Sequence, residues 1–314
     1  MTVAVLVPVR GAALYLAQAL DGVLSQQPSP DAVVVIDDGS TPALVLHPDH
    51  APRCKLVRRE TSGGPAAARA TGLVAAGDVD LVALCDSDDV WEPGKLAAQL
   101  DALARHPEAG LCFGSARIVG VDDRATGERW EEIAEGVHHA SDLAPSLYVR
   151  NPIPTSSVVV RAAALARAGG FDTTLRLAED WDLWLRLLAR GESFVSVPSA
   201  RIRYRRHPGG LTADVAALAE CQIALHEDHT GLVDSETAQR CRAADLVALA
   251  RGRARRRDWK GARAALRAAG EVRPLTGEER ALASVLAVPL ARRALGRRSP
   301  YRPEVSAARE SAGA

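Results

Sequence analysis

Hydrophobic residues follow two alternating patterns along the first part of the chain. Positions 3–9 are aliphatic almost throughout, and 32–36 and 81–85 are similar short runs. Such runs are typical of strands that are covered on both faces of a parallel sheet. Between them, apolar residues recur at helical spacing over 14–24 and 65–76. This alternation predicts βαβ units, and therefore an α/β fold with a doubly wound, mostly parallel sheet flanked by helices.

Weaker signals of the same kind continue to about Thr212. Further strands are expected at 55–57, 110–114 and 157–160, and further helices at 96–105, 162–168 and 180–190. The stretch 121–146 is polar and has no clear period, so we expect it to be irregular. Beyond Thr212 the composition changes to Ala, Arg and Leu with helical periodicity. We therefore expect an α/β domain over 1–212, a helical C-terminal extension over 213–298 and a disordered tail over 299–314.

Acidic residues gather where two of the predicted strands end. Asp37 and Asp38 follow one strand, and Asp86, Asp88 and Asp89 follow another. In open α/β sheets, ligands bind beyond the carboxyl ends of the strands. Clustered carboxylates repel one another unless a cation neutralises them, and Mg²⁺ or Mn²⁺ commonly bridges carboxylates to a diphosphate. Taken alone, each cluster is equally consistent with a solvated acidic turn or a helix cap.

A third acidic pair, Glu179 and Asp180, stands at the start of a predicted helix. A carboxylate in this position is commonly a cap. Trp181 and Trp184 are neighbours on the same helix and can shield a carboxylate from water. Because such shielding raises the pKa of a carboxyl group, a general base for an incoming hydroxyl is the alternative interpretation.

Two further segments carry weaker signals. The Ser-Gly-Gly-Pro stretch at 62–65, with Arg69 one turn into the following helix, can offer amide groups and a guanidinium to a phosphate. An ordinary loop with proline at the helix start explains it equally well. The basic run 201–207 suits either an edge strand with a solvated face or a set of cations that counter a departing diphosphate.

Composition narrows the class of protein. The 39 basic and 39 acidic residues balance, so no global basic field indicates nucleic acid as a partner. The five cysteines are widely separated without C-x-x-C spacing, which predicts neither a zinc site nor a disulfide framework. No run approaches ~18 uninterrupted apolar residues, so a transmembrane helix is not expected. We therefore expect a cytoplasmic protein.

Taken together and in order, these segments resemble the family 2 glycosyltransferases, which have the GT-A fold. The resemblance covers roughly residues 1–212. Each matching motif alone is too short to identify a family. Several of them in the family's order and spacing together are specific for it. The matching segments are Val3–Val9, Ala19–Gln26, Val34–Ser40, Gly63–Gly72, Leu84–Asp89 and Gly169–Asp172 through Glu179–Asp180.

The resemblance implies roles for the residues at the strand ends. Pro8 would lie near the nucleotide base, and Asp38, with Asp37, would contact the nucleoside. Asp86 would face the ribose and diphosphate, and Asp88 would ligate a divalent metal, Mn²⁺ or Mg²⁺. The implied donor is a nucleoside diphosphate sugar, most commonly a UDP-sugar.

The resemblance also implies the chemistry of transfer. Asp180 would be the catalytic base that deprotonates the acceptor hydroxyl for direct attack, so the anomeric configuration would invert. His207 matches a histidine that touches the diphosphate in this family. The chain departs from the family's pattern at Arg10-Gly11 and at Arg69-Ala70, where Tyr-Asn and Arg-Asn are usual. Arg69 is nevertheless our candidate for donor binding.

The expected function is thus sugar transfer to an acceptor glycan, lipid or small molecule in polysaccharide or glycolipid biosynthesis. A non-catalytic module that binds nucleotide sugars is an alternative, but Asp86, Asp88 and Asp180 are all present. A nucleotidyltransferase would ordinarily carry a Gly-rich basic loop, which residues 7–11 do not supply. A helical scaffold would leave the acidic clusters unexplained.

The C-terminal extension lies outside the resemblance. Its basic residues form two groups, one over 251–257 and one over 292–298 beside the apolar stretch 282–295. Basic residues beside an apolar helix favour contact with an anionic membrane surface. Peripheral contact with the inner membrane face is one interpretation, and a solvated helix packed on the catalytic domain is the other.

Overall fold

The computed structural model describes residues 1–11, 14–207, 209–210 and 214–287. It contains two compact units, one formed by Met1–His207 with Ala224–Ala238 and one by Pro208–Ile223 with Gln239–Ala314. The structure thus adds a short segment beyond 212 to the first unit. The functional division at 212 and 298 stays a prediction, and the tail 299–314 lies outside the described residues.

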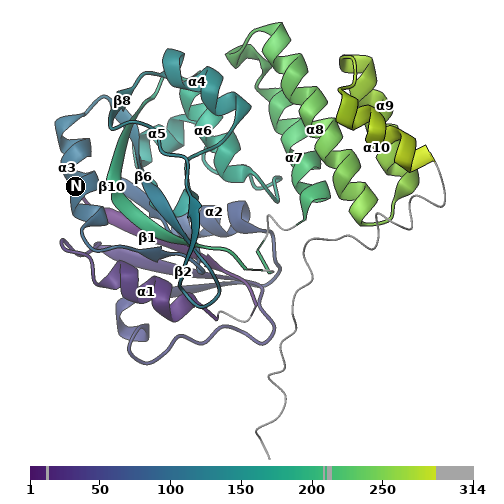
Figure 1. Ribbon diagram of the computed structural model, residues 1–314. Coiled ribbons are helices and arrows are strands. Elements are labelled where there is room, and N and C mark those ends of the chain that lie inside the picture. Colours follow the sequence, from purple (N-terminus) through teal and green to yellow (C-terminus); the bar gives the residue numbers. More distant parts are fainter. Residues whose placement is uncertain (12–13, 208, 211–213, 288–314) are drawn as a thin grey trace, which may run out of the picture. The chain divides into compact units, whose positions relative to one another are not determined.

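The first unit is built on one mixed sheet of ten strands in the order β3-β2-β1-β4-β9-β6-β10-β5, with β7 beside β6 and β8 beside β10. Figure 1 shows the long strands β6 and β10 crossing the unit. The strands are β1 (Val3–Val9), β2 (Ala32–Asp38), β3 (Lys55–Arg59), β4 (Leu81–Leu84), β5 (Val90–Trp91), β6 (Ala109–Val119), β7 (Ala125–Arg129), β8 (Gly136–His138), β9 (Val159–Arg161) and β10 (Ser193–Arg205).

The parallel half of the sheet consists of β3, β2, β1 and β4 and confirms the predicted alternation. β1 lies between β2 and β4 and is parallel to both. The carboxyl ends of these strands therefore meet at one edge, where Val9 pairs with Asp37. The two acidic clusters follow strand ends at this edge, as their positions in the sequence predicted.

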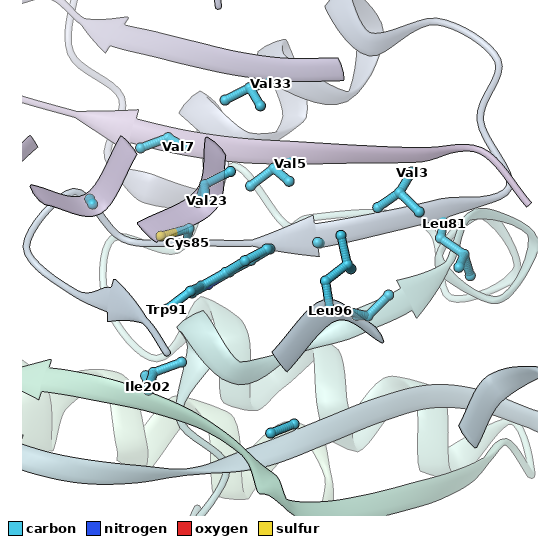
Figure 2. Close-up of a cluster of buried hydrophobic side chains, with 14 of the residues drawn as sticks. Val3, Val5, Val7, Val23, Val33, Leu81, Cys85, Trp91, Leu96 and Ile202 are labelled. Atoms are coloured by element: carbon cyan, nitrogen blue, oxygen red, sulfur yellow. The ribbon is translucent and has the colours of Figure 1, made fainter. Parts of the chain in front are cut away.

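Helices cover both faces of the parallel strands. Val3, Val5 and Val7 belong to a core shared with Val23 of the first helix and with Trp91 (Figure 2). On the other face, a Cβ at Gly72 would lie 2.6 Å from Ile36 Cδ1, so the helix and the sheet touch closely there. The helices of this unit before residue 208 are α1 (Leu16–Leu24), α2 (Pro65–Ala76), α3 (Lys95–Arg105), α4 (Ala140–Val149), α5 (Ala162–Arg167) and α6 (Glu179–Ala189).

The mixed half of the sheet differs from two expectations. The stretch 121–146 is not irregular, because it contains β7, β8 and most of α4. Its strands are short and exposed or half-buried, and α4 contains Pro145, so no sustained apolar period marks them. The run 201–205 is not an edge strand, because it is the end of β10, which pairs with β6 on one side and β5 on the other.

The second unit has a small helical core of its own. It contains parts of α7 (Val215–Asp228) and α8 (Ser235–Arg255) with all of α9 (Trp259–Val272) and α10 (Gly277–Ala287). The helix expected over 282–295 begins earlier, and its part beyond Ala287 lies outside the described residues. Within residues 1–287, as far as they are described, no helix combines the length and the apolar character that crossing a bilayer requires.

Candidate active site

The acidic loop after β4 is fastened to two other segments by its last carboxylate. Asp89 is almost fully buried, accepts a hydrogen bond of 2.6 Å from Ser156 Oγ and accepts another of 3.0 Å from the backbone amide of Arg205. Burial, with the charges of Asp88 and Asp86, raises the pKa of Asp89 well above its usual value. Asp89 therefore anchors the loop, whereas the side chains of Asp86 and Asp88 are partly exposed.

Arg205 holds the same loop through its guanidinium group. Nε donates to the backbone oxygen of Asp88, Nη1 donates to the oxygen of Gly120, and Nη2 donates to Gln18 and Asp123. The side chain is buried. Arg205 thus links β10 to the acidic loop, the turn before β7 and α1.

Asp88 and His207 form the half-exposed part of the site. His207 Nε2 lies 2.9 Å from Asp88 Oδ2, and the imidazole ring packs against Tyr15 with ring centroids 5.5 Å apart. Burial and the nearby charge of Asp86 raise the pKa of Asp88, while His207 opposes this shift. The sequence predicted both residues for the site but not their contact with each other.

The Asp88 carboxylate suits a hard divalent cation. An imidazole nitrogen of His207 lies beside it, and both side chains are partly open to solvent. Among the described residues no three or more His, Cys, Asp or Glu side chains are grouped for a metal. Mg²⁺ is usually bound through one or two carboxylates and completes its shell with water and substrate phosphates. Asp88 is therefore compatible with a metal that is shared with a diphosphate, and His207 adds a nitrogen ligand of the kind that transition metals prefer.

Arg69 joins the acidic loop after β4 to α6. Its side chain is buried, with Nη2 2.6 Å from Asp86 Oδ1 and Nη1 2.6 Å from Glu179 Oε1. Although burial alone would lower the pKa of Arg69, the charges of Asp86 and Glu179 raise it above its usual value. Arg69 is thus paired with two carboxylates, and its contact with a phosphate, one of the two interpretations of this segment, stays a prediction.

Asp180 lies at the start of α6, beside this ion-pair network. Thr155 Oγ1 donates to Asp180 Oδ2 over 2.5 Å, and the backbone amide of Trp181 donates to Oδ1 over 2.7 Å. Burial raises the pKa of Asp180, and the hydrogen bond from Thr155 and the charge of Arg69 oppose that rise. The carboxylate is therefore fixed in orientation and biased toward the proton affinity that a general base needs.

Glu179 is the more deeply buried member of the acidic pair. Burial raises its pKa to about 7, Arg69 opposes the shift, and the charge of Asp180 adds to it. The side chain points to Arg69 rather than to solvent, and it is 6% exposed. Glu179 therefore belongs to the ion-pair network, whereas Asp180 is the less buried carboxylate of the two.

The two tryptophans of α6 behave differently from each other. Trp181 Nε1 donates to the backbone oxygen of Leu147 over 2.7 Å, which ties α6 to the end of α4. Trp184 is fully buried in the core. Both rings therefore fix α6 in the fold, and the shielding of Asp180 by them stays a prediction.

Asp38 is saturated with hydrogen bonds. It accepts from Ser62 Oγ over 2.7 Å and from the amides of Gly63 and Gly64 over 3.0 and 2.9 Å, and Arg59 Nε lies 2.8 Å away. Although burial would raise the pKa of Asp38, these donors hold it below its usual value. The amides of Gly63 and Gly64, which the sequence offered as possible hydrogen-bond donors to a phosphate, therefore donate to Asp38. These bonds fix the loop before α2.

Asp37 is engaged in a similar way. It accepts from the amides of Ser40 and Leu44, and Arg58 Nη1 lies 2.7 Å from Oδ2. These contacts hold the pKa of Asp37 below its usual value against the opposing effect of burial. Pro8, half-buried in β1, is the register partner of Ile36 at the same edge of the sheet.

The structure brings the predicted residues to one edge of the sheet. Asp38 holds the loop that leads into α2, and α2 carries Arg69, which reaches both Asp86 and the residue before Asp180. Neither Thr155 nor Ser156 was predicted from the sequence, and Arg205 was predicted only as one cation of the basic run 201–207, not as a residue that holds the acidic loop. Hydroxyl residues are common in loops, so the Thr155-Ser156 pair carries no signal until its tertiary partners are known.

Solved structures share the fold of this chain. S. aureus TarS 1–349 in complex with UDP-GlcNAc has a TM-score of 0.61 and 17% identity, and the match covers 94% of this chain and 88% of TarS. Mannosyltransferase PcManGT from Pyrobaculum calidifontis, in complex with GDP-Man and Mn²⁺, has a TM-score of 0.55 and 19% identity, with 94% and 86% covered. At these identities the likeness establishes the GT-A fold.

Sequence relatives carry the same domain. Uncharacterized protein Rv1520 of Mycobacterium tuberculosis is 31% identical over 63% of this chain and 56% of its own length. The pre-mycofactocin glycosyltransferase of the same organism is 33% identical over 64% and 40%. The chain thus spans about half the length of these curated relatives. Succinoglycan biosynthesis protein ExoU of Rhizobium meliloti is 30% identical over 76% of this chain and 73% of its own length.

The family profile described as Glycosyl transferase family 2 matches residues 4–167, which is over half of the chain. The matched range includes both strand-end acidic clusters and Thr155. Together with the ExoU relationship and the GT-A fold, this match shows that the chain belongs to glycosyltransferase family 2.

Proposed function

We propose that this chain is an inverting glycosyltransferase that moves a sugar from a nucleoside diphosphate donor to an acceptor hydroxyl. The observation that carries the proposal is the Arg69 bridge. It joins Asp86, on the donor side of the site, to Glu179, the residue before Asp180. One side chain thus holds Asp86 and the residue before the proposed base, which supports a single site for the donor and the base.

The proposed donor is a nucleotide sugar, with UDP as the favoured nucleotide. TarS and PcManGT, which share the fold, were solved with UDP-GlcNAc and with GDP-Man. Pro8 and the turn formed by Asp37 and Asp38 line the expected place of the nucleoside. Since both carboxylates already accept several hydrogen bonds, the nucleoside would contact this turn after one of those donors moves aside.

The proposed transfer is one step with balanced proton movement. Asp180 accepts the proton of the acceptor hydroxyl as its oxygen bonds to the anomeric carbon, and the bond to the diphosphate oxygen breaks on the opposite face. A divalent metal, held by Asp88 with His207, would neutralise the charge of the leaving diphosphate. Thr155 fixes the orientation of Asp180, and Arg69 holds Asp86 in place.

The proposed setting is the biosynthesis of a polysaccharide, glycan or glycolipid in the cytoplasm. ExoU is named for succinoglycan biosynthesis. Peripheral membrane contact through the C-terminal helices remains part of the proposal. Two of the arginines that prompted it are already paired, Arg253 with Glu220 and Arg256 with Asp214. Equal co-sedimentation with anionic liposomes for the full chain and for a chain without 213–314 would contradict the membrane contact.

The proposed base is tested with Asp180→Asn. We expect release of nucleoside diphosphate in the presence of acceptor to fall by about 10²–10⁴-fold, because general base catalysis contributes this much. Donor binding, measured as a metal-dependent rise in melting temperature, should change little because the base acts mainly in the transition state. Wild-type turnover by Asp180→Asn would overturn the assignment.

A further inference from the structure

A groove runs along α4 in the first unit. It has a volume of about 230 Å³. Its walls come from α4 and the segments before β8 and after α4, and they include Glu131, Asp142, Leu143, Ser146, Leu147 and Arg150. None of these residues belongs to the network around Arg69. The groove is therefore a feature that the proposed donor site does not use.

The groove combines an apolar floor with a polar rim. Leu143 and Leu147 are buried, whereas Asp142, Ser146 and Arg150 are exposed. Arg150 Nη1 lies 2.7 Å from Glu131 Oε2, so the one arginine of the groove is already paired with a carboxylate. The lining also includes Asp142 and His138, so that with histidine neutral it has one net negative charge, which disfavours phosphates and other anions. Carboxylates beside an apolar floor suit a neutral ligand with many hydroxyl groups.

An aromatic pair adjoins one end of the groove. The rings of Trp130 and Tyr204 pack with centroids 4.9 Å apart. Trp130 Nε1 donates over 2.6 Å to the backbone oxygen of Pro152, which itself lines the groove. Aromatic rings offer apolar faces next to polar edges. The C–H face of a sugar ring packs on such a surface while its hydroxyl groups reach the polar rim.

The same end of the groove is connected to the proposed base, Asp180, by a short stretch of chain and by a hydrogen bond. Thr155, which hydrogen-bonds Asp180, is three residues beyond Pro152, and three residues of chain span at most ~10 Å. A second link runs from Leu147 of the groove floor to Trp181, the residue after Asp180. A chain of sugars lying in the groove would therefore end close to Asp180.

We propose that this groove is the acceptor subsite and that the acceptor is a neutral saccharide. The inference rests on the proposed glycosyltransferase function and names its acceptor class. Trp130 supplies the stacking surface, and Glu131 and Asp142 accept hydrogen bonds from sugar hydroxyls. The occupant is thus an oligosaccharide, because the net negative charge of the rim disfavours an anionic lipid phosphate.

The test uses the full chain and a matched pair of variants on α4. Ser146→Arg places a long side chain in the groove, and Ser141→Arg makes the same change at an exposed position of the same helix outside the groove. Binding of cellobiose, lactose, chitobiose and mannobiose is followed by tryptophan fluorescence and by calorimetry, with Mn²⁺ and UDP present. Inorganic phosphate is the anionic comparison.

We expect at least one disaccharide to bind the wild-type chain, and phosphate not to compete with it. Ser146→Arg should weaken that binding at least tenfold, and Ser141→Arg should leave it within twofold. Trp130→Ala should also weaken it, and Ser146→Arg keeps the test valid if Trp130→Ala does not fold. Equal affinities for the two serine variants, or no disaccharide binding to the wild type, would overturn the groove assignment.

A wrong assignment of the acceptor groove can be distinguished from a wrong proposed function. Titration of the wild-type chain with nucleoside diphosphate sugars and Mn²⁺ measures donor binding through the melting temperature. A donor effect without disaccharide binding overturns the acceptor groove alone. Absence of any donor effect overturns the proposed function, whatever the disaccharides do.

Discussion

The Thr155 hydroxyl donates a hydrogen bond of 2.5 Å to Asp180 Oδ2, and this bond lowers the pKa of a carboxyl group that burial raises. Thr155→Val removes the donor with little change in volume. The pKa of Asp180 should then rise, so the acid limb of the pH profile of kcat should move to higher pH. We expect kcat to fall roughly tenfold with an unchanged donor KM, because the bond orients the base.

Thr155→Ser is the matched control for this prediction, since it keeps the hydroxyl group. It should retain most of the wild-type rate and the wild-type pH profile. A purely structural role would instead lower kcat without moving the acid limb. Identical pH profiles for the valine and serine variants would therefore contradict a positioning role for Thr155.

Arg69→Met should strongly destabilise the first unit. The substitution leaves the buried carboxylate of Glu179 and the half-buried one of Asp86 without their shared cation. Breaking a buried ion pair by removing one partner costs about 3–5 kcal/mol. Urea denaturation at pH 7 measures the change in the free energy of unfolding.

Arg105→Met is the control for Arg69, because it breaks an exposed pair with Asp101. Exposed pairs of this spacing contribute only about 0.3–0.5 kcal/mol. Adding Glu179→Gln to Arg69→Met should recover part of the lost stability, since the amide needs no counter-charge. Equal losses for Arg69→Met and Arg105→Met would rule out a buried bridge.

Removal of the metal that Asp88 is proposed to hold should abolish donor binding. With EDTA, the rise in melting temperature on adding a nucleoside diphosphate sugar should disappear, and Mn²⁺ should restore it. Asp88→Ala should lose the effect of Mn²⁺ on donor binding. Asp122→Ala, at an exposed acidic position in the turn before β7, should behave as wild type. Donor binding that is indifferent to EDTA would remove the metal from the proposal.

Lys95 should make stability depend on pH. Its side chain is fully buried, Nζ donates to Gln99 Oε1 over 2.7 Å, and burial lowers its pKa to about 7. The unfolded chain holds this proton up to about pH 10.4. Between these two values the unfolded state binds more protons, so the free energy of unfolding should increase with pH.

The expected gain from Lys95 is at most ~3 kcal/mol between pH 7 and 9.5. It should be smaller if the contact of Nζ with the Trp91 ring, 3.7 Å from the ring centroid, supports the charged form. Lys95→Met has no proton to lose and should lack this slope. Denaturation curves of the two proteins that stay parallel across this pH range would contradict the prediction.

Much of the fold followed from local patterns because buried parallel strands have continuous apolar runs. β1 and α2 occur at the residues that periodicity predicted. The strands within 121–146 could not be predicted from local patterns, because every residue of β7 is exposed and β8 is half-buried. Such elements are stabilised by pairing with β6 and β10, and pairing partners far along the chain are invisible to a local period.

The meeting of the acidic residues at one edge of the sheet was predictable, but the partners of these residues were not. Acidic residues after parallel strands must meet at one edge, so Asp38, Asp86 and Asp88 could be grouped from the sequence. The bridge from Arg69 to Glu179 joins residues 110 positions apart. Whether an arginine faces a phosphate or a carboxylate depends on which helix packs beside it, and that is decided by tertiary structure.

Arg205 has a consequence for engineering. One guanidinium fastens the acidic loop, α1 and the turn before β7, and it shares Asp123 with Arg203. Replacing that turn with the turn of another family member would therefore disturb the acidic loop after β4, unless the new turn also carried an aspartate at position 123. Chimeras designed to change the acceptor should therefore take Asp123 and Arg205 from the same parent protein.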